Sequence, residues 1–427
     1  MEVYIEKEGE SALYASDRIV SLAMDLSEKL LEKGAQIQRV ETTVIRVCLA
    51  YGAVQVEPFA IPSLIQASVK MPDGYHTTQI RRVYQNAVDL SGLLELAKLV
   101  DKICKEKPSL EEAEREFHAI ADRPIGFDWM RIVGMPIGAG GFAVTFGGGI
   151  LDAFCAAIIG FAVAWLNILF RKKILNSTAI VVLDAFLSGM MSVLLCAVGF
   201  GKNLDAINAG TIMLFITGVL FSAALQDLIC GDLVASLFKF MQSVLSAVAI
   251  VAGYSLSLWV GTRLPVAPSP DGVTPLWADV IATCLVGTLG FCFVYRVPLK
   301  EMGFSVVGGL VSYGLWILCK NVFRFENYFL IAFLSSLGLS VYSEIVARIR
   351  KNLVSVYMTP SIFPLAPGYH LYYAIFHLMN KNTEQFWAFA SNTVLISAGI
   401  AVGVVLISLV LRIIKIPKMQ RHLHKTH

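Results

Sequence analysis

Three acidic residues lie in long apolar stretches of the sequence, where an ionisable side chain is costly to bury. Asp184 falls well inside an apolar run, deeper than a helix-capping residue reaches, whereas Asp152 follows a run of glycines. Glu344 stands at helical i,i+4 spacing from Arg348. A carboxyl group within a membrane can take up and release a proton, so Asp184, Asp152 and Glu344 are the candidates for proton coupling. The alternative is a helix cap for Asp152 and an ion pair for Glu344.

Two apolar stretches contain residues that interrupt a helix. The first has "ITG" at 216–218, and the second has three prolines and a glycine: Pro360, Pro364, Pro367 and Gly368. Irregular backbone at membrane depth persists only where it is buried in protein or lines a polar cavity. Paired breaks in the two halves of a chain are typical of a transporter's binding site. The candidate substrate-binding residues are therefore Thr217, Gly218, Pro367 and Gly368, with a packing kink as the alternative for each.

Two further features flank these stretches. Asp227 and Asp232 enclose "LICG", where they could bind substrate at the inner mouth or cap the next helix. Gly147, Gly148 and Gly149 end an apolar run rather than joining a strand to a helix, so a phosphate-binding loop is excluded. These glycines predict a tight structural hairpin between two spans.

The elements that must position these residues are membrane helices. The chain has 427 residues, 56% of them hydrophobic and 16% charged, which indicates a polytopic α-helical membrane protein. About ten segments are long enough to cross a hydrocarbon core of roughly 30 Å. They lie near 130–147, 150–170, 177–199, 208–227, 233–260, 274–295, 302–320, 328–347, 353–379 and 385–412.

Residues 1–125 predict a small cytoplasmic α+β domain. Apolar residues recur at helical spacing after Ser16, a predicted N-cap, up to a predicted stop at Gly34. The alternating segments "SLIQASVKM" and "HTTQIRRVY", joined by "PDG", then predict a β-hairpin. The remaining divisions are a first membrane repeat at 126–262, a second at 274–415 and a basic tail at 416–427.

The distribution of basic residues predicts the orientation of the chain. If residue 125 is cytoplasmic, the inner loops hold "RKK" at 171–173, "RIRK" at 348–351 and the basic tail, while the outer loops hold few basic residues. Cytoplasmic loops carry the excess of Lys and Arg. Both termini are therefore predicted to be cytoplasmic.

An internal repeat appears when the sequence is displaced by about 150 residues. "GFAVTFGGGILDAFCAAIIGFAVAWL" then lies over "GFCFVYRVPLKEMGFSVVGGLVSYGL", with Asp152 on Glu301. "DAFLSGMMSV" resembles "IAFLSSLGLSV", and "FITGVLFSAALQDLICGD" lies over "LAPGYHLYYAIFHLMNKN". Because each half would hold five spans, an odd number, the two repeats would be inverted. Chance similarity between apolar segments is the alternative.

Five stretches of the sequence point to a known family: "GAQIQRVE", "RRVYQNAVDL", "FGGGILD", "GVLFSAALQDLICGDL" and "FPLAPGYHLYYAI". With these stretches the chain resembles the bacterial threonine/serine exporter family, and it joins both homologous halves of that family in one chain. The resemblance implies a ten-span inner-membrane exporter of threonine and serine, driven by the proton gradient, with a cytoplasmic N-terminal domain. A zwitterionic amino acid needs donors for its carboxylate and acceptors for its ammonium group, and opposed half-helix ends supply both.

Other functions are less well supported. Relatives with separate halves are linked to succinate, and a dicarboxylate exporter would need fixed positive charge, for which Arg296 is the one near-membrane arginine without an evident partner. A membrane-bound hydrolase lacks a GxSxG, HExxH or P-loop motif, and the repeat disfavours a channel. We therefore predict no enzyme, no cofactor, no metal and no nucleic-acid partner. The expected partners are the lipid bilayer, protons and a small-molecule substrate, and a homo-oligomer is compatible with the sequence.

Overall fold

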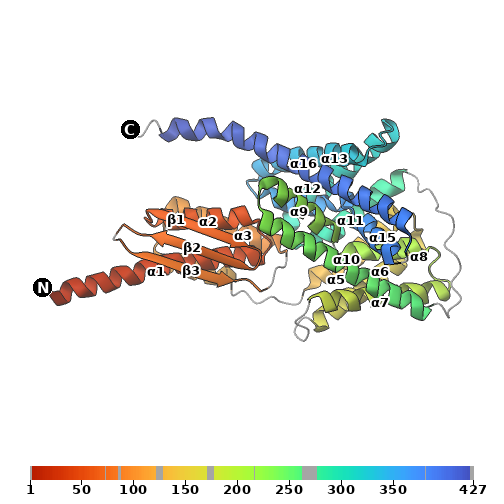
Figure 1. Cartoon of the computed structure of the whole chain (residues 1–427), viewed down its shortest axis with the longest axis horizontal. Coiled ribbons are helices and arrows are strands. Elements are labelled where there is room, and N and C mark those ends of the chain that lie inside the picture. Colours follow the sequence, from red (N-terminus) through yellow and green to blue (C-terminus); the bar gives the residue numbers. More distant parts are fainter. Residues whose placement is uncertain are drawn as a thin grey trace. The chain divides into compact units, whose positions relative to one another are not determined.

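The computed structural model describes residues 2–72, 74–84, 88–121, 128–170, 177–215, 217–261, 277–379 and 381–423 (Figure 1). The chain forms two compact units, Met1–Phe127 and Asp128–His427. Each unit is described by itself.

The first unit is an antiparallel three-stranded sheet with helices on one face. Its elements are α1 (Glu2–Glu32), α2 (Ile37–Ala50), β1 (Gln55–Ile61), β2 (Leu64–Lys70), β3 (His76–Arg82), α3 (Leu90–Glu106) and α4 (Leu110–Ala121), with the strands in the order β1-β2-β3. The predicted hairpin is confirmed as β2 and β3. α1 packs against β2 and β3, α2 packs against β1, and Ile65, Ala67 and Val69 of β2 are buried.

One prediction for this unit was wrong, and one strand was missed. Ser16 lies inside α1 rather than at its N-cap, because the preceding segment, which begins "EVYIEKEGES", is rich in residues that favour helix. Strand β1 was not predicted, because it contains Pro58, which argues against a central strand. Pro58 pairs with Ala67 on an edge strand, where a missing backbone donor is tolerated.

The second unit is helical and repeats one order of elements. The first half, residues 128–261, contains α5 (Trp129–Thr145), α6 (Ile150–Phe170), α7 (Ser177–Ala197), α8 (Leu204–Ile212), the 3₁₀ turn η1 (Met213–Phe215), α9 (Thr217–Cys230) and α10 (Leu233–Gly261). The second half, residues 277–423, contains α11 (Trp277–Val294), α12 (Leu299–Ile317), the π-helical η2 (Leu318–Val322), α13 (Tyr328–Arg350), α14 (Val354–Ser361), the 3₁₀ turn η3 (Phe363–Leu365), α15 (Gly368–Met379) and α16 (Thr383–Leu423). Apart from η2, the two halves run in the same order.

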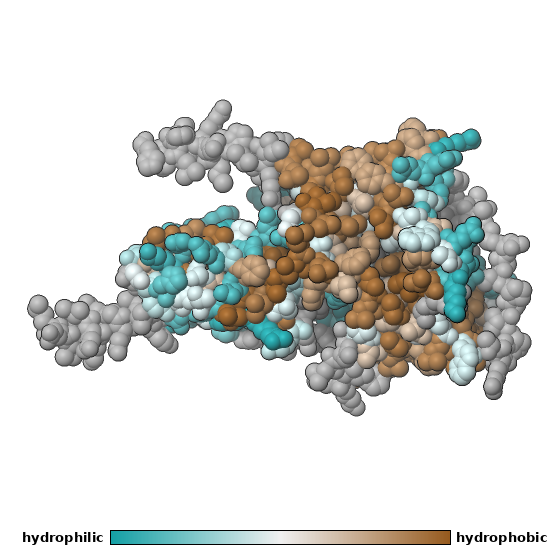
Figure 2. Space-filling view, viewed as in Figure 1, coloured by the Kyte–Doolittle hydropathy of each residue, from teal (hydrophilic) through white to brown (hydrophobic). Residues whose placement is uncertain are grey.

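The helices of the second unit include several that are long and apolar enough to cross a membrane. Among the described residues, six helices are long and apolar enough to cross one, and a seventh span results if α8–η1 and α9, bent by 46°, count together. Each of the segments expected to cross contains helix, so the protein is a polytopic membrane protein. Apolar side chains cover much of the visible surface of this unit (Figure 2). The expected loop around 262–273 and the end of the basic tail, 424–427, lie outside the described residues.

Helices α5 and α11 hold the two halves together at close range. A Cβ placed on Gly290 of α11 would lie 2.2 Å from the backbone nitrogen of Gly138 in α5, and one on Gly134 would lie 2.6 Å from the carbonyl oxygen of Gly290. Only glycine permits backbones to approach this closely. At these glycines the contact between α5 and α11 is therefore backbone against backbone.

Candidate functional site

Asp184 is a buried carboxylate in the middle of α7. It is 4% exposed, and Asn167 of α6 donates a hydrogen bond to its Oδ2 at 2.9 Å. Its Oδ1 has no hydrogen-bond partner among the residues that the structure describes. A buried, half-satisfied carboxylate is costly as an anion, and protonation removes much of that cost. Of the three candidates for proton coupling, this one has the geometry of a group that changes its charge.

A group of polar side chains that sequence reasoning missed continues from Asp184 toward α8. Ser188 donates to the Asp184 carbonyl oxygen at 2.8 Å, and Ser192 Oγ lies 2.6 Å from Asn208 Oδ1. Thr211 Oγ1 lies 2.7 Å from the hydroxyl of Tyr254. Small polar residues are common in membrane helices, so only the i,i+4 series of Asp184, Ser188 and Ser192 could have indicated this group.

The break in each interrupted span contacts the helix pair α5 and α11. In the first half, Leu214 of η1 approaches Gly138 of α5, and in the second half Phe363 of η3 stacks on Phe291 of α11 with ring centroids 3.9 Å apart. Pro367 and Gly368 are buried at the start of α15. The next residue, Tyr369, stacks on Phe146 at the end of α5. The α5–α11 pair thus borders both breaks.

At the first break the structure describes the backbone on both sides of residue 216. α9 begins at Thr217, directly after residue 216, but the side-chain surroundings of Thr217 and Gly218 lie outside the described part of the chain. The second break contains Pro360 within α14 and Pro364 within η3, as expected from their effect on helices. Opposed half-helix ends at both breaks offer backbone donors and acceptors without a buried net charge.

Asp152 serves as an anchor for backbone at the start of α6. Its Oδ2 accepts from the backbone nitrogen of Gly149 at 2.8 Å, and its Oδ1 accepts from those of Lys202 and Asn203 at 2.7 and 3.0 Å. Gly149 closes the α5–α6 turn with Gly147, which has φ of +94°, and Gly148. This geometry favours the capping interpretation of Asp152 over proton coupling.

Glu301, the residue aligned with Asp152, occupies the third position of α12 as Asp152 does of α6. Its oxygens accept from Arg350 at 2.8 and 3.2 Å and from the Tyr357 hydroxyl at 2.6 Å. Asp152 therefore ties the start of α6 to the residues just before α8, and Glu301 ties the start of α12 to the end of α13 and to α14.

The remaining candidate acids lie near helix ends. Asp227 forms an ion pair with Lys239 of α10 at 2.6 Å, and Asp232 is exposed just before α10. Glu344 pairs with Arg348 at 3.6 Å, as its spacing predicted. These residues are not brought together with Asp184 by any contact that the structure describes.

Arg296 is paired, which corrects the sequence interpretation. Its guanidinium donates to Asp128 from Nη2 at 2.8 Å and from Nε at 3.3 Å. Arg131 lies 3.6 Å from the same carboxylate. The pairing could not be read from the sequence, because the two residues lie far apart along the chain. Because Asp128 neutralises this guanidinium, Arg296 does not supply the fixed positive charge that a dicarboxylate exporter would need.

Neither metal nor thiol chemistry is indicated. Within the described ranges, no group of three or more His, Cys, Asp or Glu side chains could hold a metal ion. Of the cysteines, Cys48 is fully buried in the first unit, and this burial raises the pKa of its thiol to about 12. Such a thiol is a packing residue and a poor nucleophile.

Comparison with known proteins gives one consistent family. A family model described as "Putative threonine/serine exporter" matches residues 21–260, and one described as "Threonine/Serine exporter" matches residues 280–410. The "Probable threonine/serine exporter" of Mycobacterium tuberculosis is 22% identical over 406 residues, covering 90% of this chain and 76% of that protein. The "Threonine/serine exporter" of Corynebacterium glutamicum is 21% identical over 410 residues, covering 91% and 81%. No solved structure matches the chain.

Proposed function

Because the chain belongs to the threonine/serine exporter family, we propose that it exports threonine and serine across the bacterial inner membrane in exchange for protons. The family is one of transporters and not of enzymes. The observation that carries the proposed proton coupling is the buried, half-satisfied carboxylate of Asp184. A proton bound there on one side of the membrane can be released on the other.

We place the substrate at the two interrupted spans. Thr217, Gly218, Pro367 and Gly368 mark these breaks, and half-helix ends there can meet the carboxylate and the ammonium group of an amino acid. Asp227 and Asp232 are then contacts at the inner mouth, although Asp227 is held by Lys239. In this proposal Asp152 and Glu344 are structural.

Alternating access would arise from two inverted halves of five spans each. The repeated order of helices and the matched anchors at Asp152 and Glu301 support this duplication. The basic residues of the sequence favour cytoplasmic termini and a cytoplasmic α+β unit. The proton gradient would then favour one orientation of the halves, with Asp184 protonated, over the other.

A flux measurement tests the function. Purified protein is reconstituted into vesicles, a proton gradient is imposed, and flux of labelled threonine, serine and succinate is compared. We expect threonine and serine flux that collapses with the gradient, and succinate flux at the level of empty vesicles. Gradient-independent threonine flux would contradict proton exchange, and succinate flux alone would contradict the substrate.

Two pairs of variants test the residues. Asp184→Asn keeps the shape of the side chain but cannot release a proton, so driven threonine flux should fall to background, while Glu344→Gln should retain it.

Gly368→Leu fills the buried second break and should raise the KM for threonine at least about tenfold. Gly314→Leu is its control, because a Cβ at Gly314 meets no atom within 4 Å.

A further inference from the structure

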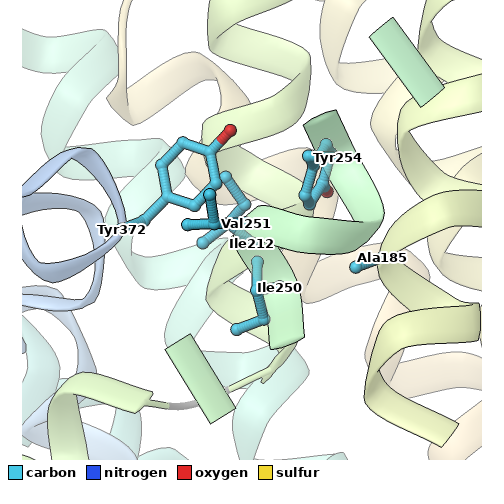
Figure 3. Packing of buried hydrophobic residues seen from close by; sticks show 6 residues of the cluster. All are labelled: Ala185, Ile212, Ile250, Val251, Tyr254 and Tyr372. Atoms are coloured by element: carbon cyan, nitrogen blue, oxygen red, sulfur yellow. The ribbon is translucent and has the colours of Figure 1, made fainter. Parts of the chain in front are cut away.

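The side chain of Tyr254 belongs to a buried cluster that includes Ala185, the residue after Asp184. The cluster comprises Ala185 of α7, Ile212 of α8, Ile250, Val251 and Tyr254 of α10, and Tyr372 of α15. Figure 3 shows these side chains converging from the four helices. Tyr254 is 0% exposed, so its hydroxyl can be satisfied only by neighbouring side chains or backbone.

The hydroxyl of Tyr254 joins the third and fourth helices of the first half. It lies 2.7 Å from Thr211 Oγ1 in α8, just before the first break, and it also interacts with the side chain of Ser188. Ser188 follows Asp184 by one helical turn and donates to its carbonyl oxygen. One phenol group thus connects the helix of the buried carboxylate with the helix that leads into the break.

The ring of Tyr254 contacts the other interrupted span. Its edge meets the ring of Tyr372 in α15 with centroids 5.8 Å apart and planes at 76°, a favourable edge-to-face arrangement. α15 is the helix that follows the second break. A single side chain therefore touches the helix before the first break and the helix after the second.

We propose that Tyr254 is a positioning residue that couples Asp184 to both interrupted spans. The inference rests on the proposed proton exchange. When Asp184 is protonated, its carboxyl group gains an O–H donor that needs an acceptor inside the protein. This new donor changes the bond with Asn167 and would shift α7 at Asp184. Ser188, which donates to the Asp184 carbonyl oxygen, connects this part of α7 to Tyr254 and, through it, to Thr211. Their rearrangement would loosen or tighten α8 against α10 and move Tyr254 relative to Tyr372.

A double-mutant cycle tests this role in the full-length protein. Tyr254→Phe and Thr211→Val each remove the same hydrogen bond from opposite sides and keep the buried shape. We expect each to lower the maximal rate of proton-driven threonine export about tenfold with an unchanged KM, and the double variant to be no slower than either. Effects that multiply in the double variant, or a changed KM at an unchanged maximal rate, would overturn the proposal.

A matched control separates coupling from stability. Tyr342→Phe also removes one tyrosine hydrogen bond of 2.7 Å, to the Phe304 carbonyl oxygen, but Tyr342 lies in α13 and not in the cluster of Tyr254. It should transport as the parent protein does, and equal slowing of both tyrosine variants would overturn the specific role. If Tyr254→Phe does not fold, Thr211→Val alone tests the proposal. It should still lower the maximal rate about tenfold and leave the KM unchanged.

The same assay distinguishes the two proposals. If Asp184→Asn retains driven export, the proposed proton carrier is wrong, and the coupling role of Tyr254 falls with it. If Asp184→Asn loses driven export and Tyr254→Phe keeps it, only the inference on Tyr254 is overturned.

Discussion

The first half of the membrane unit has a buried carboxylate and a buried tyrosine at positions where the second half has aliphatic residues. Both have a buried cluster at matching positions, with Ala185 and Ile250 in one and Ala332 and Ile400 in the other, separated by about 150 residues. Beside Ala185 stands Asp184, whereas beside Ala332 stands Ile331. The position of Tyr254 is taken by Val404 in the second cluster.

The two halves agree at the positions that pack the helices and differ at the position of the carboxylate. Positions that set helix packing are filled by similar small or branched side chains in both halves, because the same helix order needs the same close contacts. In the proposed exchange one carboxylate would carry one proton, so the acid is needed in one half only. Its hydrogen-bond partner Asn167 and the tyrosine Tyr254 are correspondingly found in one half only, because the aligned Trp316 and Val404 are apolar.

The largest expected effect comes from breaking the contact between the halves. Gly290→Ala places a methyl group 2.2 Å from the backbone of Gly138, and backbone cannot yield as a flexible side chain does. We expect a loss of about 3 kcal/mol or more of stability and little folded protein. Gly303→Ala, where a Cβ meets no atom within 4 Å, should be neutral or slightly stabilising. Thermal unfolding in detergent compares them, and equal midpoints would contradict the tight contact.

The next test moves the carboxylate from one half to the other. The double variant Asp184→Ile with Ile331→Asp keeps the composition but puts the acid among the residues of the second cluster, next to Ala332. We expect proton-driven threonine flux to fall about a hundredfold, because the residue aligned with Asn167 in the second half is Trp316, which cannot accept or donate as an amide does. Ile331→Val is the control and should transport normally. Driven flux through the double variant would show that the halves are chemically interchangeable.

The two anchors should differ in strength. Asp152→Asn turns an NH₂ group toward backbone nitrogens that also donate, which should cost about 3 kcal/mol. Glu301→Gln retains an acceptor for Tyr357 and faces a partly exposed arginine, so about 1.5 kcal/mol is expected. The measurement is chemical unfolding of each variant, with the exposed Asp205→Asn as control. A larger loss in Glu301→Gln would contradict this ranking.

The smallest expected effect concerns the contact that follows each interrupted span. Asp227 pairs with Lys239 in the first half, and at the aligned positions His377 stacks on Phe389 with centroids 5.4 Å apart. Replacing the first pair by the second, Asp227→His with Lys239→Phe, should restore about 1 kcal/mol relative to either single change.

Transport by this double variant then decides the role of Asp227. A stable variant that exports threonine normally would remove Asp227 from the substrate site and leave it a packing role. A stable variant with a raised KM would support a substrate contact at the inner mouth.

Much of the fold and part of the site could be predicted from the sequence. Long apolar runs, the glycine turn and the prolines act locally, so helices, the hairpin turn and the breaks were predictable. Asp184 stood out because a carboxylate in an apolar run is costly wherever it packs. The pairing of Arg296 with Asp128 was not predictable, because nothing local connects residues so far apart along the chain.

The sequence by itself determined a membrane protein of repeated helical order, its family and the position of a carboxylate, Asp184, well inside the apolar helix α7. These follow from composition, periodicity and residue chemistry, which do not depend on what packs against what. Only the tertiary structure decided that Asp152 holds backbone, that Arg296 is neutralised and that Tyr254 lies between two interrupted spans. Such roles are set by which helices meet, and a tyrosine or an aspartate in an apolar run carries no sign of its neighbours until the chain has folded.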